Sequence, residues 1–227
     1  MDFCVIMTVW NFNNKISFVI ERAYDLFDHI IVLDTGSTDG SVETLQKLEK
    51  KGLIEFYHYN KDRGAGRDSN FLLEKVNAYK PEWIVKLDHD EYYEDSLYDE
   101  IKKIRDLSDK YGWITSYRVT LWKNTNKYRI DRRYRWFHEN TMFRWKEGLT
   151  YPEDAIHHME RIPESLMKLK KYKTKARLIH LSQIDKKRIK LQIERLKEFE
   201  RDWTDNYYPE KLKLKVFKEK LRKGKRN

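Results

Sequence analysis

The first part of the chain alternates between two hydrophobic patterns. Short runs that are apolar almost throughout are typical of buried parallel strands, and between them lie stretches with apolar residues at helical spacing. The strand-like runs are residues 3–9, 29–33, 54–57 and 83–87, and the helix-like stretches are residues 15–27, 42–48 and 71–78. Strands that alternate with helices in this way predict an α/β fold, with a mostly parallel sheet flanked by helices.

The pattern changes after about residue 112, where aromatic and charged residues interleave. Residues 113–122 predict a further strand, and residues 134–145 predict one or two more. Residues 186–203 carry apolar side chains on one face of a strongly charged helix. We therefore expect one folded domain over residues 1–182 and a basic helical C-terminal extension over residues 183–227.

Composition narrows the class of protein. Apolar residues make up 40% of the 227-residue chain and aromatic residues 14%, which argues against disorder. The formal net charge of +10 suits a nucleic acid, an anionic membrane surface or a phosphorylated substrate, and charge alone does not choose among them. The single cysteine, Cys4, excludes an intrachain disulfide. Because the sequence shows neither a run of about 20 apolar residues nor a secretory signal, we expect a cytoplasmic protein.

Three loops with unusual polar side chains follow predicted strands. They are residues 10–14, 34–40 and 88–91. In doubly wound sheets ligands bind beyond the carboxyl ends of the strands, so these loops mark one candidate site. In the second loop Asp34 has the chemistry to accept hydrogen bonds from a nucleobase or ribose, and Gly36 and Ser37 let the backbone approach a ligand. The same residues also suit an ordinary strand-to-helix turn.

The third loop begins with Asp88-His89-Asp90, directly after an apolar strand. Two carboxylates one residue apart are hard oxygen ligands for Mg²⁺ or Mn²⁺, and such a metal would also bridge to a diphosphate. The acidic run continues through Glu91, so a solvated turn is the alternative for the motif in isolation. Between the acidic loops, Arg67 has a guanidinium suited to a pyrophosphate, with a flexible charged loop as the alternative.

Four segments together resemble the glycosyltransferases of family 2. Thr8-Val9-Trp10-Asn11 is similar to the family's first strand end, and residues 34–40 resemble its second, DxGSxDGT-like motif. Gly64-Ala65-Gly66-Arg67 with Asn70 resembles the stretch that opens the family's third helix, and residues 83–91 resemble its apolar strand closing in DxD. The closing Asp90-Glu91 resembles the end of this motif in the branch related to lipopolysaccharide core glucosyltransferases. The QxxRW signature of large polysaccharide synthases is not found.

The resemblance implies a GT-A (Rossmann-like) fold and an inverting, metal-dependent glycosyltransferase of the hexosyltransferase type. The donor would be a nucleoside-diphosphate sugar, UDP-linked by family frequency and GDP- or dTDP-linked otherwise, bound by residues 1–95. The acceptor, which would be a glycan, a lipid-linked sugar or a protein, would meet residues 96–182. The residues expected to bind the nucleotide sugar are Thr8, Trp10, Asn11, Asp34, Gly36, Ser37, Arg67, Lys86, Asp88 and His89.

The resemblance also implies a metal site. Mn²⁺ or Mg²⁺ would be held by Asp88 and Asp90. His180 would be a further ligand, because many GT-A enzymes use a late histidine for this purpose. A lone histidine in an apolar run is otherwise typical of a satisfied core residue.

A catalytic base would deprotonate the acceptor hydroxyl, which then attacks the anomeric carbon in one displacement. In the family this base is acidic and lies beyond the DxD motif. Asp154 is our first choice and Glu153 our second. His157-His158 aligns with a His-Glu pair of the lipopolysaccharide-like branch, which leaves the assignment open.

The acceptor half offers only general signals. Aromatic residues have flat faces that stack on sugars, although most such residues lie in cores or on strand faces. The candidates are Tyr128, Tyr134, Trp136, Phe137 and Trp145. The last 19 residues hold nine Lys or Arg against two Glu, with Leu214, Phe217 and Leu221 at helical spacing. Such a tail suits peripheral contact with an anionic membrane, a solvated helix or an oligomer contact.

Two other functions fit part of the sequence. A sugar nucleotidyltransferase shares a crevice of this kind, but it usually opens with a glycine-rich loop and an Arg-Lys pair, which residues 10–13 lack. A basic nucleic-acid-binding protein would explain the charge and the aromatic residues. It would not explain acidic loops at the strand ends, which repel phosphates, so we expect no nucleic acid as a partner.

Overall fold

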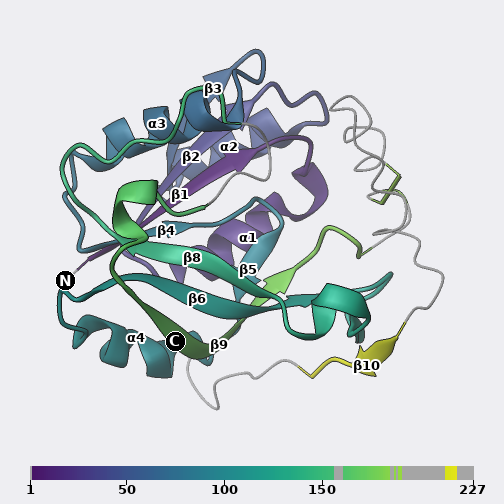
Figure 1. Cartoon of the computed structure of the whole chain (residues 1–227). Helices are drawn as coiled ribbons and strands as arrows, with labels where there is room; N and C mark the ends of the chain where they lie inside the picture. Colours follow the sequence, from purple (N-terminus) through teal and green to yellow (C-terminus); the bar gives the residue numbers. More distant parts are fainter. Residues whose placement is uncertain (1, 156–160, 185–186, 188, 191–212, 219–227) are drawn as a thin grey trace.

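The computed structural model describes residues 2–155, 161–184, 187, 189–190 and 213–218 (Figure 1). Within them, eight strands form one mixed sheet in the order β3-β2-β1-β4-β8-β6-β9-β5, and β7 and β10 form a separate pair. The strands are β1 Phe3–Val9, β2 His29–Thr35, β3 Glu55–Tyr59, β4 Trp83–Lys86, β5 Glu91–Tyr93, β6 Tyr111–Thr120, β7 Lys127–Arg129, β8 His138–Arg144, β9 Lys170–His180 and β10 Leu214–Val216. The helices are α1 Asn13–Tyr24, α2 Ser41–Lys50, α3 Ala65–Val76 and α4 Leu97–Arg105, with short 3₁₀ helices η1 Arg132–Arg135 and η2 Glu164–Leu166.

Strand β1 lies in the middle of the parallel half of the sheet and shows how the core is divided. It pairs in parallel with β2 on one side and β4 on the other, and β2 pairs in parallel with β3. Because successive side chains of a strand point to opposite faces, Val5 and Met7 join the core that includes α1 and α2, whereas Cys4 and Ile6 join the core that includes α3. Helices cover both faces of this half, which explains its nearly continuous apolar strands.

The second half of the sheet departs from this regular alternation. β8 pairs antiparallel with β4, β6 pairs antiparallel with β8, and β9 runs parallel to β6. β5 follows β4 closely in the sequence, yet β8, β6 and β9 lie between them, and β5 forms an edge of the sheet, antiparallel to β9. β5 also packs against α1, so the sheet curls back on itself. The connection between β4 and β5 is the acidic loop, and its course brings that loop beside the end of β9, where the Leu181 N–H donates to the Asp90 carbonyl.

The structure confirms the predicted α/β fold with a mostly parallel sheet flanked by helices, since four of the seven pairings in the large sheet are parallel. The third helix begins at Ala65 rather than near residue 71. Its first turn is polar and so shows no apolar period; this turn packs on the distant segment 151–155 instead. Strands β5 and β9 and helix α4 were not predicted.

The C-terminal extension differs from its prediction where the structure describes it. Leu214–Val216 is a strand, β10, paired antiparallel with β7, so the helical spacing assigned to Leu214 and Phe217 is wrong. Two or three apolar positions are too few to distinguish a helical period from a strand period. The pairing with β7 provides hydrogen-bond partners for the backbone of this segment. Residues 191–212 and 219–227, which hold most of the predicted helix and Leu221, lie outside the described residues. Among the described helices, none has the length and apolarity needed to cross a bilayer.

Candidate active site

The loops after β1 and β2 interlock at the carboxyl end of the sheet. The backbone N–H of Asn11 donates to the Ser37 hydroxyl over 2.8 Å, and the N–H of Thr38 donates to the Asn11 side-chain carbonyl over 2.8 Å. Asn11 has a positive φ of 48°, a conformation that asparagine tolerates better than most residues. The predicted ligand-binding residues Asn11 and Ser37 are therefore brought together in one hydrogen-bonded platform, with the partly buried Trp10 beside them.

Asp34 organises this platform. Its side chain is fully buried, and one carboxylate oxygen accepts the N–H groups of Gly36 and Ser37 at 3.0 and 2.9 Å. The same oxygen lies 3.1 Å from the Nδ1 atom of His58. Gly36 is required here because its φ is +94° and a Cβ atom would lie 2.9 Å from the Asn60 carbonyl oxygen. Asp34 shapes the loop, and a direct contact of its carboxylate with a ligand stays a prediction.

The acidic loop after β4 closes on itself and sends its carboxylates in different directions. The Asp88 N–H donates to the Glu91 carboxylate, and the Glu91 N–H donates to the Asp88 carbonyl. Asp88 keeps a half-exposed side chain, whereas Asp90 and Glu91 are buried. His89 turns toward β1, with its Nδ1 atom 3.1 Å from the Thr8 carbonyl oxygen and its ring against Phe12. This contact fixes the acidic loop to the end of β1. Thr8 and His89, which were predicted to belong to one site, are therefore neighbours.

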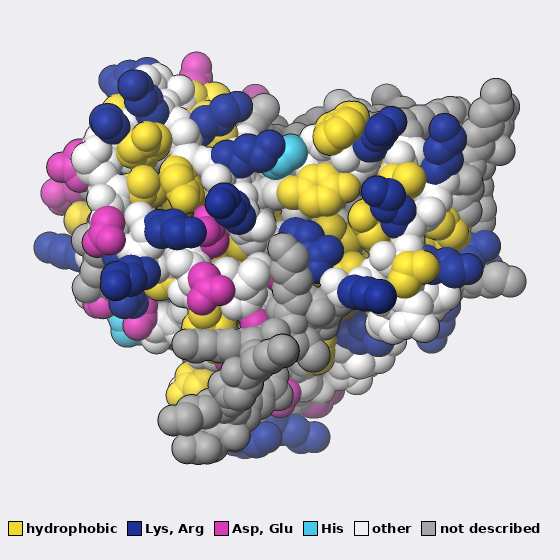
Figure 2. Space-filling view, turned by 90° about the horizontal axis from the view of Figure 1, so that it is seen from below, with side chains coloured by type: hydrophobic (Ala, Val, Ile, Leu, Met, Phe, Trp, Pro, Cys, Tyr) yellow, Lys and Arg dark blue, Asp and Glu magenta, His cyan; other side chains and the backbone are white. Residues whose placement is uncertain are grey.

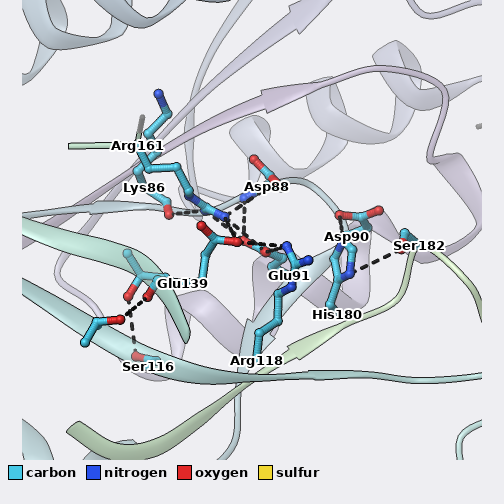
Figure 3. A network of polar contacts seen from close by, with 12 residues as sticks. Lys86, Asp88, Asp90, Glu91, Ser116, Arg118, Glu139, Arg161, His180 and Ser182 are labelled. Atoms are coloured by element: carbon cyan, nitrogen blue, oxygen red, sulfur yellow. Dashed lines mark hydrogen bonds and ion pairs between the residues drawn. The ribbon is translucent and has the colours of Figure 1, made fainter. Parts of the chain in front are cut away.

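Asp90 faces His180, which stands at the end of β9. The Nε2 atom of His180 lies 3.5 Å from a carboxylate oxygen of Asp90, and its Nδ1 atom lies 3.2 Å from the Ser182 hydroxyl (Figure 3). Burial lowers the pKa of His180 to about 4, against the opposing effect of Asp90. The imidazole is therefore neutral at pH 7, which is the form that binds a metal.

A buried arginine, Arg161, joins the acidic loop to the rest of the site, and sequence analysis missed it. Its guanidinium donates to both carboxylate oxygens of Glu91, at 3.1 and 2.8 Å, and to the carbonyl of Lys86 (Figure 3). It also lies 3.5 Å from Asp88 and 3.9 Å from Glu139. Burial by itself would lower the pKa of Arg161, but the surrounding carboxylates raise it well above its usual range. Arg161 belongs to no motif, and no local pattern in the sequence marks it.

This network sets the charge at the site. Partial shielding from water would raise the pKa of Asp88, yet Arg161 and the neighbouring histidines hold it below its ordinary value. Burial raises the pKa of Glu91, and the two-pronged contact with Arg161 opposes that rise. Burial and the positive charge of Arg161 lower the pKa of Lys86 to about 7. The Lys86 amine donates to the Ser69 hydroxyl over 3.0 Å and lies over the ring of Tyr151.

Segment 151–155 carries the candidate bases and packs on the opening of α3. The Asn70 side chain makes two hydrogen bonds with the backbone of Tyr151, and the Gly66 N–H donates to the Ala155 carbonyl. Glu153 and Asp154 are exposed, and Glu153 lies 3.5 Å from Arg67. The structure thus unites Arg67 with this segment. His157-His158 lies outside the described residues.

The three predicted metal ligands lie in one region but do not converge. Asp88 points to Arg161 and Asp90 points to His180, as Figure 3 shows. In the part of the chain that the structure describes, no three His, Cys, Asp or Glu side chains form a group able to hold a metal ion. Two carboxylates and a neutral imidazole are nevertheless donors whose chemistry fits Mn²⁺.

Comparison with known proteins finds similarity to glycosyltransferases. The family model described as glycosyl transferase family 2 matches residues 4–163. No curated protein sequence matches the chain. Among solved structures, S. aureus TarS is similar with a TM-score of 0.59 and 14% identity, over 86% of this chain and 40% of that chain. The mannosyltransferase PcManGT from Pyrobaculum calidifontis, in complex with GDP-Man and Mn²⁺, is similar with a TM-score of 0.60 and 14% identity, over 93% of this chain and 66% of that chain.

At this level of identity the two solved structures establish the fold, which is that of GT-A glycosyltransferases. The chain spans 40% and 66% of their respective lengths. The family match shows more than the fold, because it runs from β1 through the acidic loop to Arg161 and covers well over half of the chain. This protein therefore belongs to glycosyl transferase family 2.

Proposed function

We propose that this protein is a metal-dependent, inverting glycosyltransferase of the hexosyltransferase type that takes its sugar from a nucleoside diphosphate. The observation that carries the proposal is the pairing of Asp90 with a neutral His180, 3.5 Å apart, beside the half-exposed Asp88. This group lies where the acidic loop meets the interlocked loops after β1 and β2. In our proposal residues 1–95 bind the nucleotide sugar, residues 96–182 receive the acceptor, and residues 183–227 form an extension.

The metal would be held by Asp88, Asp90 and His180. When bound, Mn²⁺ or Mg²⁺ neutralises charge on the departing nucleoside diphosphate. Support for Mn²⁺ comes from the similar mannosyltransferase, whose structure contains GDP-Man and Mn²⁺. Arg161 holds Glu91 and faces Asp88, so it fixes the loop that presents these ligands.

The donor base would rest on the platform organised by Asp34, and Arg67 at the opening of α3 would meet the diphosphate. UDP is our first expectation for the nucleotide, with GDP and dTDP as alternatives. Asp154 or Glu153 would accept the proton of the attacking hydroxyl, from the segment that packs on α3. We assign the acceptor to glycans, lipid-linked sugars or proteins, the branch to that of lipopolysaccharide core glucosyltransferases, and the location to the cytoplasm, with peripheral contact at the membrane.

Thermal unfolding with UDP, GDP and dTDP, each with and without Mn²⁺, tests the proposal. A ligand present at 100 times its Kd stabilises the folded state by about 2.7 kcal/mol, which raises the Tm by several degrees. We expect one nucleotide to stabilise the parent only together with Mn²⁺, and Asp90→Asn and His180→Gln to abolish that shift. Asp109→Asn, at a fully exposed carboxylate, is the matched control and should keep it. Absence of a shift with every nucleotide, or an unchanged shift in Asp90→Asn, refutes the proposal.

A further inference from the structure

A second hollow lies apart from the acidic loop, between β6, β8, β9 and the β7–β10 pair. Its volume is about 1060 Å³, and Tyr117, Tyr128 and Lys215 are among the residues that line it. In the view from below, where β10 comes to the front, hydrophobic and basic side chains gather on the right-hand half and acidic ones are nearly absent (Figure 2). We call this hollow the basic groove.

Strand alternation places the basic groove on the opposite face of the β6–β8 pair from the acidic network. Tyr117 and His138 line the groove and are partners in the strand register. Their neighbours Arg118 and Glu139 point the other way and form an ion pair at 2.8 Å beside Arg161. Since successive residues of a strand face opposite sides, the groove and the candidate active site share two strands but not a surface.

The groove offers aromatic faces to a ligand. Tyr117, Tyr128 and Trp136 all line it, and 72% of Trp136 is exposed. A tryptophan with this exposure presents a large, flat aromatic face to solvent, the kind of surface on which the apolar face of a sugar ring stacks. The guanidinium of Arg135 lies 5.0 Å from the Trp136 ring, so a cation stands next to the aromatic face.

The groove also presents several positively charged side chains to a ligand. Arg135, Lys173, Lys213 and Lys215 line it, and none of these four cations is paired with an acidic side chain within the described part of the chain. The lining residue Asp131 does not offset them, because it is buried and paired with Arg129 through two hydrogen bonds. Lys213 and Lys215 are two residues apart, so the extended chain turns both side chains to one side.

Flat aromatic faces together with cations that have no acidic partner among the described residues fit a ligand that has apolar C–H faces and anionic groups. We propose that the basic groove binds an anionic glycan, a chain of sugars bearing phosphate, sulfate or carboxylate groups. This inference rests on the proposed function, and among the acceptors proposed there it selects a glycan. The groove lies on the opposite face of β6 and β8 from the candidate active site, so it binds a part of the acceptor glycan that is remote from the reacting hydroxyl. Binding there raises the local concentration of the acceptor near the active site.

Fluorescence anisotropy with a labelled dextran sulfate oligosaccharide tests this inference at physiological salt. We expect Trp136→Ala and the double variant Lys213→Ala/Lys215→Ala each to weaken binding at least fivefold. A neutral dextran of the same length should bind at least tenfold more weakly than the sulfated one. The matched control is Lys47→Ala/Lys51→Ala, two lysines on and just after the surface helix α2, which should leave binding unchanged.

Two further ligands separate the glycan from other polyanions. Single-stranded oligothymidylate and phosphatidylserine vesicles are measured with the same variants. The proposal is overturned if either binds more tightly than dextran sulfate through Trp136 and the two lysines, or if all variants bind dextran sulfate like the parent.

The same variants also separate this inference from the proposed function. They should keep the nucleotide- and Mn²⁺-dependent rise in Tm, because the groove lies on the opposite face from Asp90 and His180. Loss of groove binding in the variants with no nucleotide shift in the parent refutes the proposed function alone. A nucleotide shift in the parent with no effect of the groove variants on glycan binding refutes this inference alone.

Discussion

Gly66→Ala is the substitution whose effect the structure determines most sharply. Gly66 is the second residue of α3, and its N–H, which has no partner within the helix, donates to the Ala155 carbonyl. A Cβ atom at this position would lie 1.9 Å from the carbonyl oxygen of Pro152 and 3.0 Å from that of Glu153. Both atoms belong to the backbone, so segment 151–155 must move away from α3.

Two opposing contributions set the size of the effect. Alanine is favoured over glycine inside a helix by about 1 kcal/mol, which alone would stabilise the variant. Displacing the segment breaks the Gly66–Ala155 hydrogen bond and the two between Asn70 and Tyr151. At about 1 kcal/mol each, these bonds contribute about 3 kcal/mol. We expect Gly66→Ala to lower the free energy of unfolding by about 2 kcal/mol.

Urea unfolding of four chains measures this effect: the parent, Gly66→Ala, Asn70→Ala and the double variant. Because the Asn70 contacts are already lost in Gly66→Ala, the second substitution should cost far less there than in the parent. Gly52→Ala, where a Cβ atom meets nothing within 4 Å and only the positive φ is strained, is the control and should be additive with Asn70→Ala. A Gly66→Ala variant that is more stable than the parent, or Asn70→Ala costs that are equal in both backgrounds, would refute the reasoning.

Two more predictions concern buried groups. Arg161→Met should lower the free energy of unfolding by about 3 kcal/mol, because the buried Glu91 carboxylate keeps only the Arg118 guanidinium, at 3.9 Å, as a positively charged neighbour among the described residues, and adding Glu91→Gln should recover at least half of the loss in urea unfolding. Burial, assisted by Glu55, raises the pKa of the Cys4 thiol from 9.0 to about 12, so the folded chain holds this proton more tightly than the unfolded chain. The parent should therefore lose stability relative to Cys4→Ala by about 1 kcal/mol per pH unit above pH 9, and an equal pH dependence of the two would contradict this assignment.

The parallel half of the fold and its loops could be predicted because their signals are local. Each strand from β1 to β4 is an apolar run, and the polar loops follow these strands directly, so the carboxyl-end rule places Asn11, Ser37 and His89 together. The segment 151–155 shows the limit of such signals. Gly66 and Asn70 at the opening of α3 matched a family motif. Their contacts are with a segment far along the same chain, since Tyr151 lies 81 residues after Asn70.

The sequence by itself determined the elements of the first half, the family and the residues of the acidic loop, because periodicity and motif are carried by neighbouring residues. Only the tertiary structure decided what that loop contacts. β5 leaves β4 for the far edge of the sheet and pairs with β9, which sets Glu91 in register with His180. It also decided that Arg161, 70 residues from Glu91, lies between the carboxylates. These contacts follow from strand order and register, which arise from packing across the whole domain rather than from any local pattern.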